Sequence, residues 1–194
     1  MDLILNYEEK KPFDNLLYLA KPVYGGWVTF TAHLSYKYKL PIYKIAGRNE
    51  TFQRDYGYEC KYQNINIDKV IQLKNILITA IDKHYYEYLY LFPENTKVII
   101  HDPTECKPNK KNPNPLVQTT DKNETILLNH FKIITIRESV QEYLINRFNV
   151  KSLFMPHPFY AYDLPKCNGL GFECVSISRI DFDKNTDIIL KCNK

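Results

Sequence analysis

Short runs of apolar, β-branched residues alternate with helical segments along most of this sequence. That alternation constrains the fold more than any other feature. The clearest runs are NILITAI at 75–81, TKVIIH at 96–101 and FKIITI at 131–136. Runs with so few polar residues are typical of strands buried on both faces, as in parallel sheets. The sequence therefore predicts an α/β fold, a Rossmann-like doubly wound, mainly parallel sheet with helices on both faces.

The remaining elements continue the alternation. Further strands are expected at 14–20, 41–46, 58–67, 151–155 and 173–178, and helices at 27–40, 68–73, 83–91, 121–129, 138–148 and 184–190. Asp68 is expected to cap the second helix, and Glu138 or Ser139 the helix at 138–148. The stretch 102–115, rich in Pro, Asn and Lys, is expected to be a long loop.

The length of 194 residues corresponds to one or two domains. Residues 156–171 hold several Pro and Gly residues among polar ones, which indicates a domain boundary. We expect residues 1–160 to form one Rossmann-like domain. Residues 161–194 supply only a strand and a helix, so they are expected to be the truncated start of a second domain.

Composition excludes several classes of protein. Hydrophobic residues make up 44% and charged residues 25%, which is ordinary for a globular chain. The net charge of +4 is too small to indicate a nucleic-acid partner, and no apolar run reaches the ~20 residues of a membrane span. The five cysteines are odd in number and contain no C-x-x-C pair, so no metal site or disulfide framework is indicated. These features favour a cytoplasmic protein with reduced thiols.

Ligands of doubly wound sheets bind beyond the carboxyl ends of the strands, so the loops there are candidate sites. Gly25 and Gly26 precede a helix whose free N–H groups can meet an anion, although they fit a tight turn equally well. His101 and Asp102 close a strand, where an imidazole can contact a ligand. A lone histidine is more often structural.

Cationic residues stand at two further turns from strand to helix. Arg137 and Glu138 follow the strand at 131–136, where Arg137 can meet an anion and Glu138 can simply cap the helix. Arg179 and Lys184 lie five residues apart, a spacing that lets both reach a diphosphate. The alternative is a polar turn paired with its own aspartates.

The segment VSISRIDFDKNTDIIL at 175–190 resembles the start of the C-terminal domain in GT-B-fold glycosyltransferases, most closely the large retaining group called family 4. Ser178, Arg179, Ile180 and Lys184 match in order and spacing, whereas Asn185 stands where glycine is common. Upstream, the glycine pair before a helix, TKVIIHD, and FKIITIRESVQEYLINRF resemble that family's N-terminal domain. KSLFMPHPFY has His-Pro where the family has Asn-Gly.

The resemblance implies a glycosyltransferase that moves a sugar from a nucleotide-diphosphate sugar to a glycan, lipid or protein acceptor, without a metal or other cofactor. Residues 1–160 would then be the acceptor-side domain, and residues 161–194 would begin the nucleotide-sugar-binding domain. By resemblance, Arg179 and Lys184 hold the donor diphosphate and stabilise the leaving group. Gly25 and Gly26 approach the donor, and His101 faces the reacting sugar as the catalytic candidate.

The expected contacts to acceptor or sugar are Asp102, Arg137, Glu138 and His157. The family's later pair of glutamates has no counterpart before Lys194. This piece alone is therefore expected to be inactive, with the rest of the C-terminal domain supplied in cis or in trans.

Two other functions remain open. A truncated glycosyltransferase can persist as a non-catalytic module that binds a glycan or a partner. A different Rossmann-like enzyme, such as a two-domain nucleotide-sugar epimerase, shares the same alternation of strands and helices.

Overall fold

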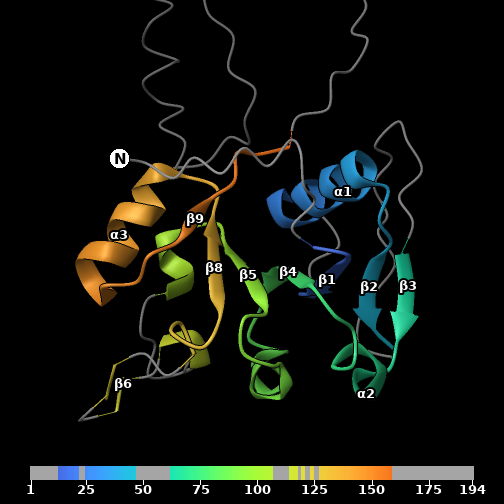
Figure 1. Ribbon diagram of the computed structural model, residues 1–194, viewed down its shortest axis with the longest axis horizontal. Helices are drawn as coiled ribbons and strands as arrows, with labels where there is room; N and C mark the ends of the chain where they lie inside the picture. The colour runs from blue at the N-terminus through green and yellow to red at the C-terminus, as the bar shows by residue number, and fades with distance from the viewer. Residues whose placement is uncertain are drawn as a thin grey trace, which may run out of the picture. The chain divides into compact units, whose positions relative to one another are not determined.

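A seven-stranded parallel sheet forms the centre of the protein (Figure 1). The structure is a computed structural model that describes residues 13–21, 25–46, 62–106, 114–117, 119–120, 123–124 and 127–158. The strands lie in the order β3-β2-β1-β4-β5-β8-β9, and all neighbouring pairs are parallel. The order reverses between β1 and β4, which makes this the switch point of a doubly wound sheet. The predicted α/β, Rossmann-like fold is confirmed.

The strands of this sheet are short. They are β1 (Asn15–Leu19), β2 (Ile42–Ile45), β3 (Tyr62–Ile65), β4 (Ile76–Ile81), β5 (Lys97–Ile100), β8 (Lys132–Thr135) and β9 (Leu153–Phe154). The α-helices are α1 (Gly26–Tyr38), α2 (Ile67–Val70) and α3 (Glu138–Phe148). Three 3-10 helices, η1 (Tyr86–Leu91), η2 (Pro103–Cys106) and η3 (Pro115–Val117), join them, and β6 (Thr119–Thr120) pairs antiparallel with β7 (Asn123–Glu124).

The central strands are buried on both faces, as their apolar sequences predict. All six residues of β4 are buried. Successive side chains of a strand point to opposite faces, and Leu77 and Ile78 accordingly belong to two separate core clusters. The neighbouring strand β5 shows the same alternation: Ile99 belongs to the cluster of Leu77, and Val98 belongs to that of Ile78. The sheet thus separates two cores.

Among the described residues, helix α1 supplies the helical residues of one core. Val28, Phe30, Ala32 and Leu34 of α1 are fully or almost fully buried in this cluster. The helix ends at Lys39, which adopts the left-handed conformation with φ 56° and donates its N–H to the Ser35 carbonyl. In the described part of the chain, α1 is therefore the helix that covers this face, and its first turn lies at the carboxyl edge of the sheet.

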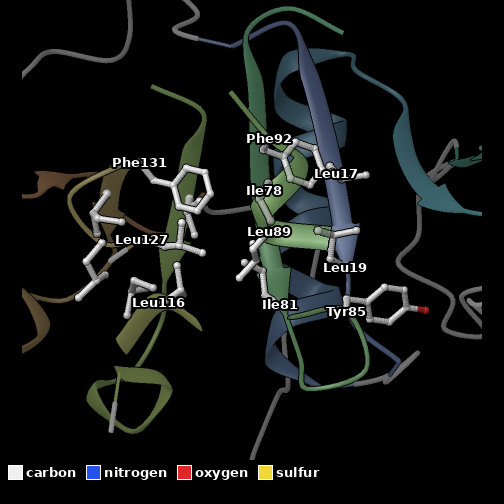
Figure 2. Close-up of a cluster of buried hydrophobic side chains, with 14 of the residues drawn as sticks. Leu17, Leu19, Ile78, Ile81, Tyr85, Leu89, Phe92, Leu116, Leu127 and Phe131 are labelled. Carbon is white, nitrogen blue, oxygen red and sulfur yellow. The ribbon is translucent and has the colours of Figure 1, made fainter. Parts of the chain in front are cut away.

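The opposite face is covered by several short elements. Figure 2 shows their aliphatic and aromatic side chains meeting those of the sheet, with Phe92 near Leu17 and Ile78 and with Tyr85 near Leu19 and Ile81. Other members come from α2, η2, η3 and α3, among them Val70, Cys106, Leu116, Val140 and Leu144. This cluster is the larger of the two, so this face holds the principal hydrophobic core.

Some local expectations were wrong. The segment 83–91 is not an α-helix from its start, because the Asp82 side chain accepts the His84 N–H at 2.8 Å and holds a turn. The 3-10 helix η1 begins only at Tyr86.

The helix expected at 121–129 is also absent from the part of that segment described: Asn123–Glu124 is a strand, and a turn carries Leu127 and Leu128 into the core. Leu127 and Leu128 are adjacent in sequence, and a turn can bury both side chains more readily than one face of a helix can.

The capping predictions were wrong as well. Asn66, rather than Asp68, stands at the N-cap of α2, and Asp68 lies in the first turn. Arg137 is the N-cap residue of α3, and neither Glu138 nor Ser139 occupies that position. Neither cap makes a side-chain hydrogen bond to its helix. Acidic residues in the first turn still interact favourably with the helix dipole, which explains their presence there.

The described residues all lie in the first of two compact units, Met1–Tyr160 and Ala161–Lys194. The strand expected at 173–178 and the helix expected at 184–190 lie outside the described residues, so the second domain stays a prediction. None of the helices that the structure describes combines the length and the apolar character needed to cross a membrane.

Candidate functional site at the carboxyl edge of the sheet

The predicted site residues come together at one edge because all seven strands run in the same direction. Gly25 and Gly26 open α1 after β1, and His101 directly follows β5. Arg137 follows β8, and His157 follows β9. Asp102 and Glu138 stand beside them in sequence. Arg179 and Lys184 lie outside the described residues, so their expected contact with a diphosphate stays a prediction.

The glycine pair leaves open space at the start of α1. Gly25 has φ 95° and ψ −170°, a conformation that side chains with a Cβ rarely adopt. Its carbonyl accepts the Thr29 N–H at 3.1 Å and so begins the helix. A Cβ added at Gly25 or Gly26 would have no neighbour within 4 Å. A ligand can therefore approach the backbone closely here.

Thr79 is an extra residue in the pairing of β4 with β1. Leu17 pairs with Ile78 and Tyr18 pairs with Ala80, so Thr79 is left over as a β-bulge. Its hydroxyl lies 2.8 Å from the Thr31 hydroxyl of α1 and 3.3 Å from the Leu17 carbonyl. The bulge also points the Thr79 carbonyl toward His101. Thr79 therefore bonds to helix α1, to strand β1 and to the loop after β5.

His101 is held as a neutral imidazole. Its Nε2 lies 2.7 Å from the Thr79 carbonyl, and because a carbonyl only accepts, Nε2 carries the proton and Nδ1 is the acceptor nitrogen. The ring meets Phe30 edge-on, with centroids 4.9 Å apart, and Trp27 at 6.3 Å. Burial, with smaller contributions from the charges of His157 and Arg137, lowers the pKa of His101 to about 4, although the bond to Thr79 acts in the opposite direction.

Glu105 joins the loop after β5 to the first turn of α1. Its Oε1 accepts the Trp27 indole N–H at 3.1 Å, and its Oε2 accepts the His101 backbone N–H at 3.1 Å. Burial raises the pKa of this carboxyl to about 7, although both hydrogen bonds favour the ionised form. The Glu105 carbonyl in turn accepts the Asn114 side-chain amide, which anchors the loop.

Asp102 and Arg137 form the exposed rim of the site. Asp102 Oδ1 accepts both the backbone N–H and the hydroxyl of Thr104, at 2.9 and 2.7 Å, and so shapes the start of η2. Arg137 Nη1 lies 3.5 Å from Asp102 Oδ2, with both side chains well exposed. This pair bridges the loops after β5 and β8. Glu138 is exposed in the first turn of α3.

His157 reaches the site from the segment after β9. Its ring meets Phe30 edge-on with centroids 5.0 Å apart, on a residue that also contacts His101. The His33 ring lies 6.0 Å away. Phe30 thus separates two imidazoles that sequence reasoning placed in unconnected loops.

A second carboxylate stands at the switch point itself. Asp82, directly after β4, accepts the Lys21 backbone N–H at 2.6 Å and the His84 backbone N–H at 2.8 Å. Nearby, burial raises the pKa of Tyr86, and Asp82 and Glu105 raise it further. Burial also raises the pKa of the Cys106 thiol to about 12, so that cysteine stays a thiol.

Sequence reasoning missed two contributors to the site, Trp27 and Thr79. Both carried a usable signal. Thr79 is the polar residue inside an apolar strand, and Trp27 is the single tryptophan, directly after the glycine pair. Glu105 was noticed in the sequence only as an acidic neighbour of His101, and its bond to Trp27 follows from the fold.

Two groups at this edge have strongly perturbed pKa values: the Glu105 carboxyl at about 7 and the His101 imidazole at about 4. Perturbed groups of this kind are typical of sites that perform acid–base work, and also of buried structural networks. Within the described residues, no group of three or more His, Cys, Asp or Glu side chains could hold a metal ion.

Comparison with known proteins adds no relative: no family model matches the chain, and no curated protein or solved structure shows a significant similarity to it.

Proposed function

We propose that this chain is the acceptor-side part of a GT-B-type glycosyltransferase, which uses a nucleotide-diphosphate sugar as donor. The observation that carries the proposal is the bond between Trp27 and Glu105 at the carboxyl edge of the sheet. It joins the helix start at Gly26 to the loop of His101, the two places that the sequence resemblance assigns to donor and reacting sugar. The Rossmann-like fold supports the same proposal but is shared by many other activities.

The charge distribution supports an acceptor role for this half. Asp82 and Glu105 make the β4–β5 side of the edge electronegative, which disfavours a diphosphate and favours a polyhydroxyl ligand. The diphosphate in this proposal is held by Arg179 and Lys184. Glu105, with a pKa of about 7, is suited to accept the proton of an acceptor hydroxyl.

The direct test is a transfer assay on the longest natural form of the protein that contains this chain. A panel of nucleotide-diphosphate sugars is supplied with glycan and lipid acceptors, and release of nucleoside diphosphate is followed by phosphorus NMR. Arg179→Ala and Lys184→Ala are expected to abolish release. Lys151→Ala, an exposed lysine at the opposite end of β9, is the matched control and should leave turnover unchanged. Full turnover in both site variants would contradict the proposal.

The variant Gly26→Ala tests ligand contact at the glycine backbone without destabilising the fold. Its new methyl group meets nothing within 4 Å, and alanine favours a helix by up to about 1 kcal/mol over glycine. The variant should therefore fold at least as stably as the wild type. If the donor contacts this backbone, its KM should rise by about tenfold or more, as loss of 1.4 kcal/mol of binding requires. An unchanged KM would remove Gly26 from the donor site.

A non-catalytic binding module is the second candidate, favoured by one observation. Nε2 of His101 and both oxygens of Glu105 are already engaged in internal hydrogen bonds, as expected for a structural network. This candidate predicts binding to immobilised glycans without measurable affinity for any nucleotide sugar. Calorimetric titration of the same protein with both ligand classes distinguishes the two proposals.

A further inference from the structure

Three lysines stand at the amino ends of β5, β8 and β9, which are neighbours in the sheet (Figure 1). Lys97 is the first residue of β5, Lys132 is the first residue of β8, and the two are direct partners in the pairing of these strands. Ile134 of β8 pairs with Leu153 of β9, and the same register continued back by two residues sets Lys151 beside Lys132. We call these three residues the lysine ladder.

The side chains of the ladder leave the sheet on one face. Side chains alternate along a strand, and the residues two positions further along, Ile99, Ile134 and Leu153, all pack in the cluster beneath α1. Lys97 is half-buried, and the other two lysines are exposed. Neighbouring strands lie about 4.8 Å apart, so the three ammonium groups can reach a single ligand together.

The lysines of the ladder repel one another. Burial lowers the pKa of Lys97, and the charge of Lys132 acts in the same direction. Asp14, directly before β1, acts on this pKa in the opposite direction and has the smallest effect of the three. The charge of the neighbouring strand is therefore felt at Lys97 more strongly than that of the carboxylate.

No carboxylate in the described part of the chain forms an ion pair with the ladder. Both ion pairs found among these residues lie at the opposite, carboxyl edge of the sheet. Asp14 accepts the side-chain amide of Asn75 at 2.9 Å, and Glu94, three residues before Lys97, is exposed. The described residues thus place three cations in a row without a matching anion.

We propose that the lysine ladder binds a ligand that carries two or more neighbouring phosphate groups. Such a ligand supplies several negative charges in a compact group, and so replaces repulsion between the lysines by attraction. Lysine ammonium groups act as flexible point charges that suit phosphate oxygens. An extended acidic peptide fits less well, because carboxylates on one side of it lie about 6.6 Å apart, which is wider than the spacing of the ladder.

The ladder is separate from the candidate site described above, because the two lie at opposite edges of the sheet. The inference therefore does not depend on the proposed glycosyltransferase activity. Loss of a ladder lysine is expected to leave turnover in the transfer assay unchanged.

Inorganic tripolyphosphate is the probe for a soluble ligand. We would titrate it into the full chain by isothermal titration calorimetry at about 10 mM and about 150 mM salt. Saturable binding is expected at the lower salt concentration and should weaken at the higher one, because exposed charges are screened. In a parallel NMR titration, the backbone amide signals of Lys97, Lys132 and Lys151 should shift, which locates the ligand.

Glutamine variants assign the binding to the ladder. Lys97→Gln and Lys132→Gln should each weaken binding of tripolyphosphate by about tenfold, as expected for loss of one charge-assisted hydrogen bond. Lys132→Gln should also raise the pKa of Lys97 in the absence of the probe. The matched control is Lys69→Gln, an exposed lysine of α2, whose neighbour Val70 packs on the opposite face of the sheet. This variant loses the same charge and should bind as the wild type does.

Vesicles distinguish a phosphate ligand in a lipid headgroup from a soluble one. Cosedimentation with phosphatidylcholine vesicles that contain a phosphatidylinositol bisphosphate, without binding of tripolyphosphate, would assign the ladder to lipid headgroups. Binding of tripolyphosphate without cosedimentation would assign it to a soluble ligand.

Three results would overturn the proposal. One is the lack of saturable binding of either probe at the lower salt concentration. Another is binding by both ladder variants that equals binding by Lys69→Gln. The third is a set of shifted amide signals that excludes the ladder, which decides the question with the wild type even if a variant fails to fold.

Discussion

The two faces of the sheet are built differently. Under α1, polar side chains are buried among the apolar ones: Thr31, Ser35, Thr79 and His101 all make hydrogen bonds there. The opposite face is filled by aliphatic and aromatic side chains from several short elements (Figure 2). Apolar contacts are tolerant of small shifts, whereas buried hydrogen bonds require particular partners and geometry.

This difference indicates a division of labour. The face opposite α1 holds the larger hydrophobic cluster, so it contributes the larger share of apolar burial. The polar face fixes the start of α1 against the loop after β5, because Thr79, His101 and Glu105 each bond to a different element. Changes on the first face should therefore alter stability alone. Changes on the second should alter the properties of the candidate site.

The largest expected effect belongs to the apolar face. Ile78→Ala removes a fully buried side chain next to Thr79 in sequence but on the opposite side of the sheet. We expect a loss of about 2–5 kcal/mol in the free energy of unfolding, measured with urea. Trp27 fluorescence of the folded protein should be unchanged. A shifted Trp27 spectrum would show that the two faces are coupled and would break the comparison.

On the polar face, Glu105 and His101 should make the free energy of unfolding depend on pH in opposite directions. The two dependences should cancel in the wild type. Burial raises the Glu105 pKa from 4.5 to about 7, so its contribution to stability is present below pH 4.5 and lost as the pH rises through 7. Burial lowers the His101 pKa from 6.5 to about 4, so its contribution is present above pH 6.5 and lost as the pH falls through 4. Each contribution is at most about 3 kcal/mol.

Single variants should reveal the two pH dependences of the unfolding free energy separately. Glu105→Gln leaves His101, so the stability of that variant should fall on acidification from pH 6.5 to 4. His101→Gln leaves Glu105, so its stability should fall on alkalinisation from pH 4.5 to 7. Urea unfolding at half-unit pH steps measures both. Slopes of the same sign in the two variants would contradict the assignment.

The sheet could be predicted from sequence because its information is local. NILITAI, TKVIIH and FKIITI each show a buried strand without reference to the rest of the chain. The helix at 121–129 could not be excluded in this way, because Leu127 and Leu128 gain their burial from elements distant in sequence. Their apolar character fits a turn inserted into a core as well as it fits a helix.

The candidate site was predictable only in outline. Parallel strands bring Gly26, His101 and Arg137 to one edge, so their positions followed from the topology. The bond from Trp27 to Glu105 spans 78 residues, and its existence depends on how α1 packs. Likewise, no local pattern shows that Thr79 is a bulge, since the bulge arises from the register between two strands.

A smaller effect is expected from the bulge residue. Thr79→Val keeps the shape but removes the hydroxyl shared with Thr31 and Leu17, at a cost of about 1 kcal/mol. Ile78→Val is the matched control on the other face, with a similar expected cost of 0.5–1.5 kcal/mol. Only Thr79→Val should alter Trp27 fluorescence, because Thr31 also bonds to the Trp27 carbonyl. Equal spectra in both variants would remove the bulge from the site.

The smallest effect on stability, and the most selective one, is expected for Arg137→Ala. The ion pair with Asp102 is exposed and 3.5 Å long, so its loss should cost no more than about 0.5 kcal/mol. The Arg137 charge also lowers the pKa of both His157 and His101. Its removal should therefore raise the titration midpoints of both imidazoles, as followed by NMR of their ring protons. Lys151→Ala removes an exposed charge at the other edge and should leave both midpoints in place. Unmoved midpoints in Arg137→Ala would mean that the rim and the buried face act independently. A raised midpoint would show that the exposed Arg137 charge changes the pKa of the imidazoles on the polar face.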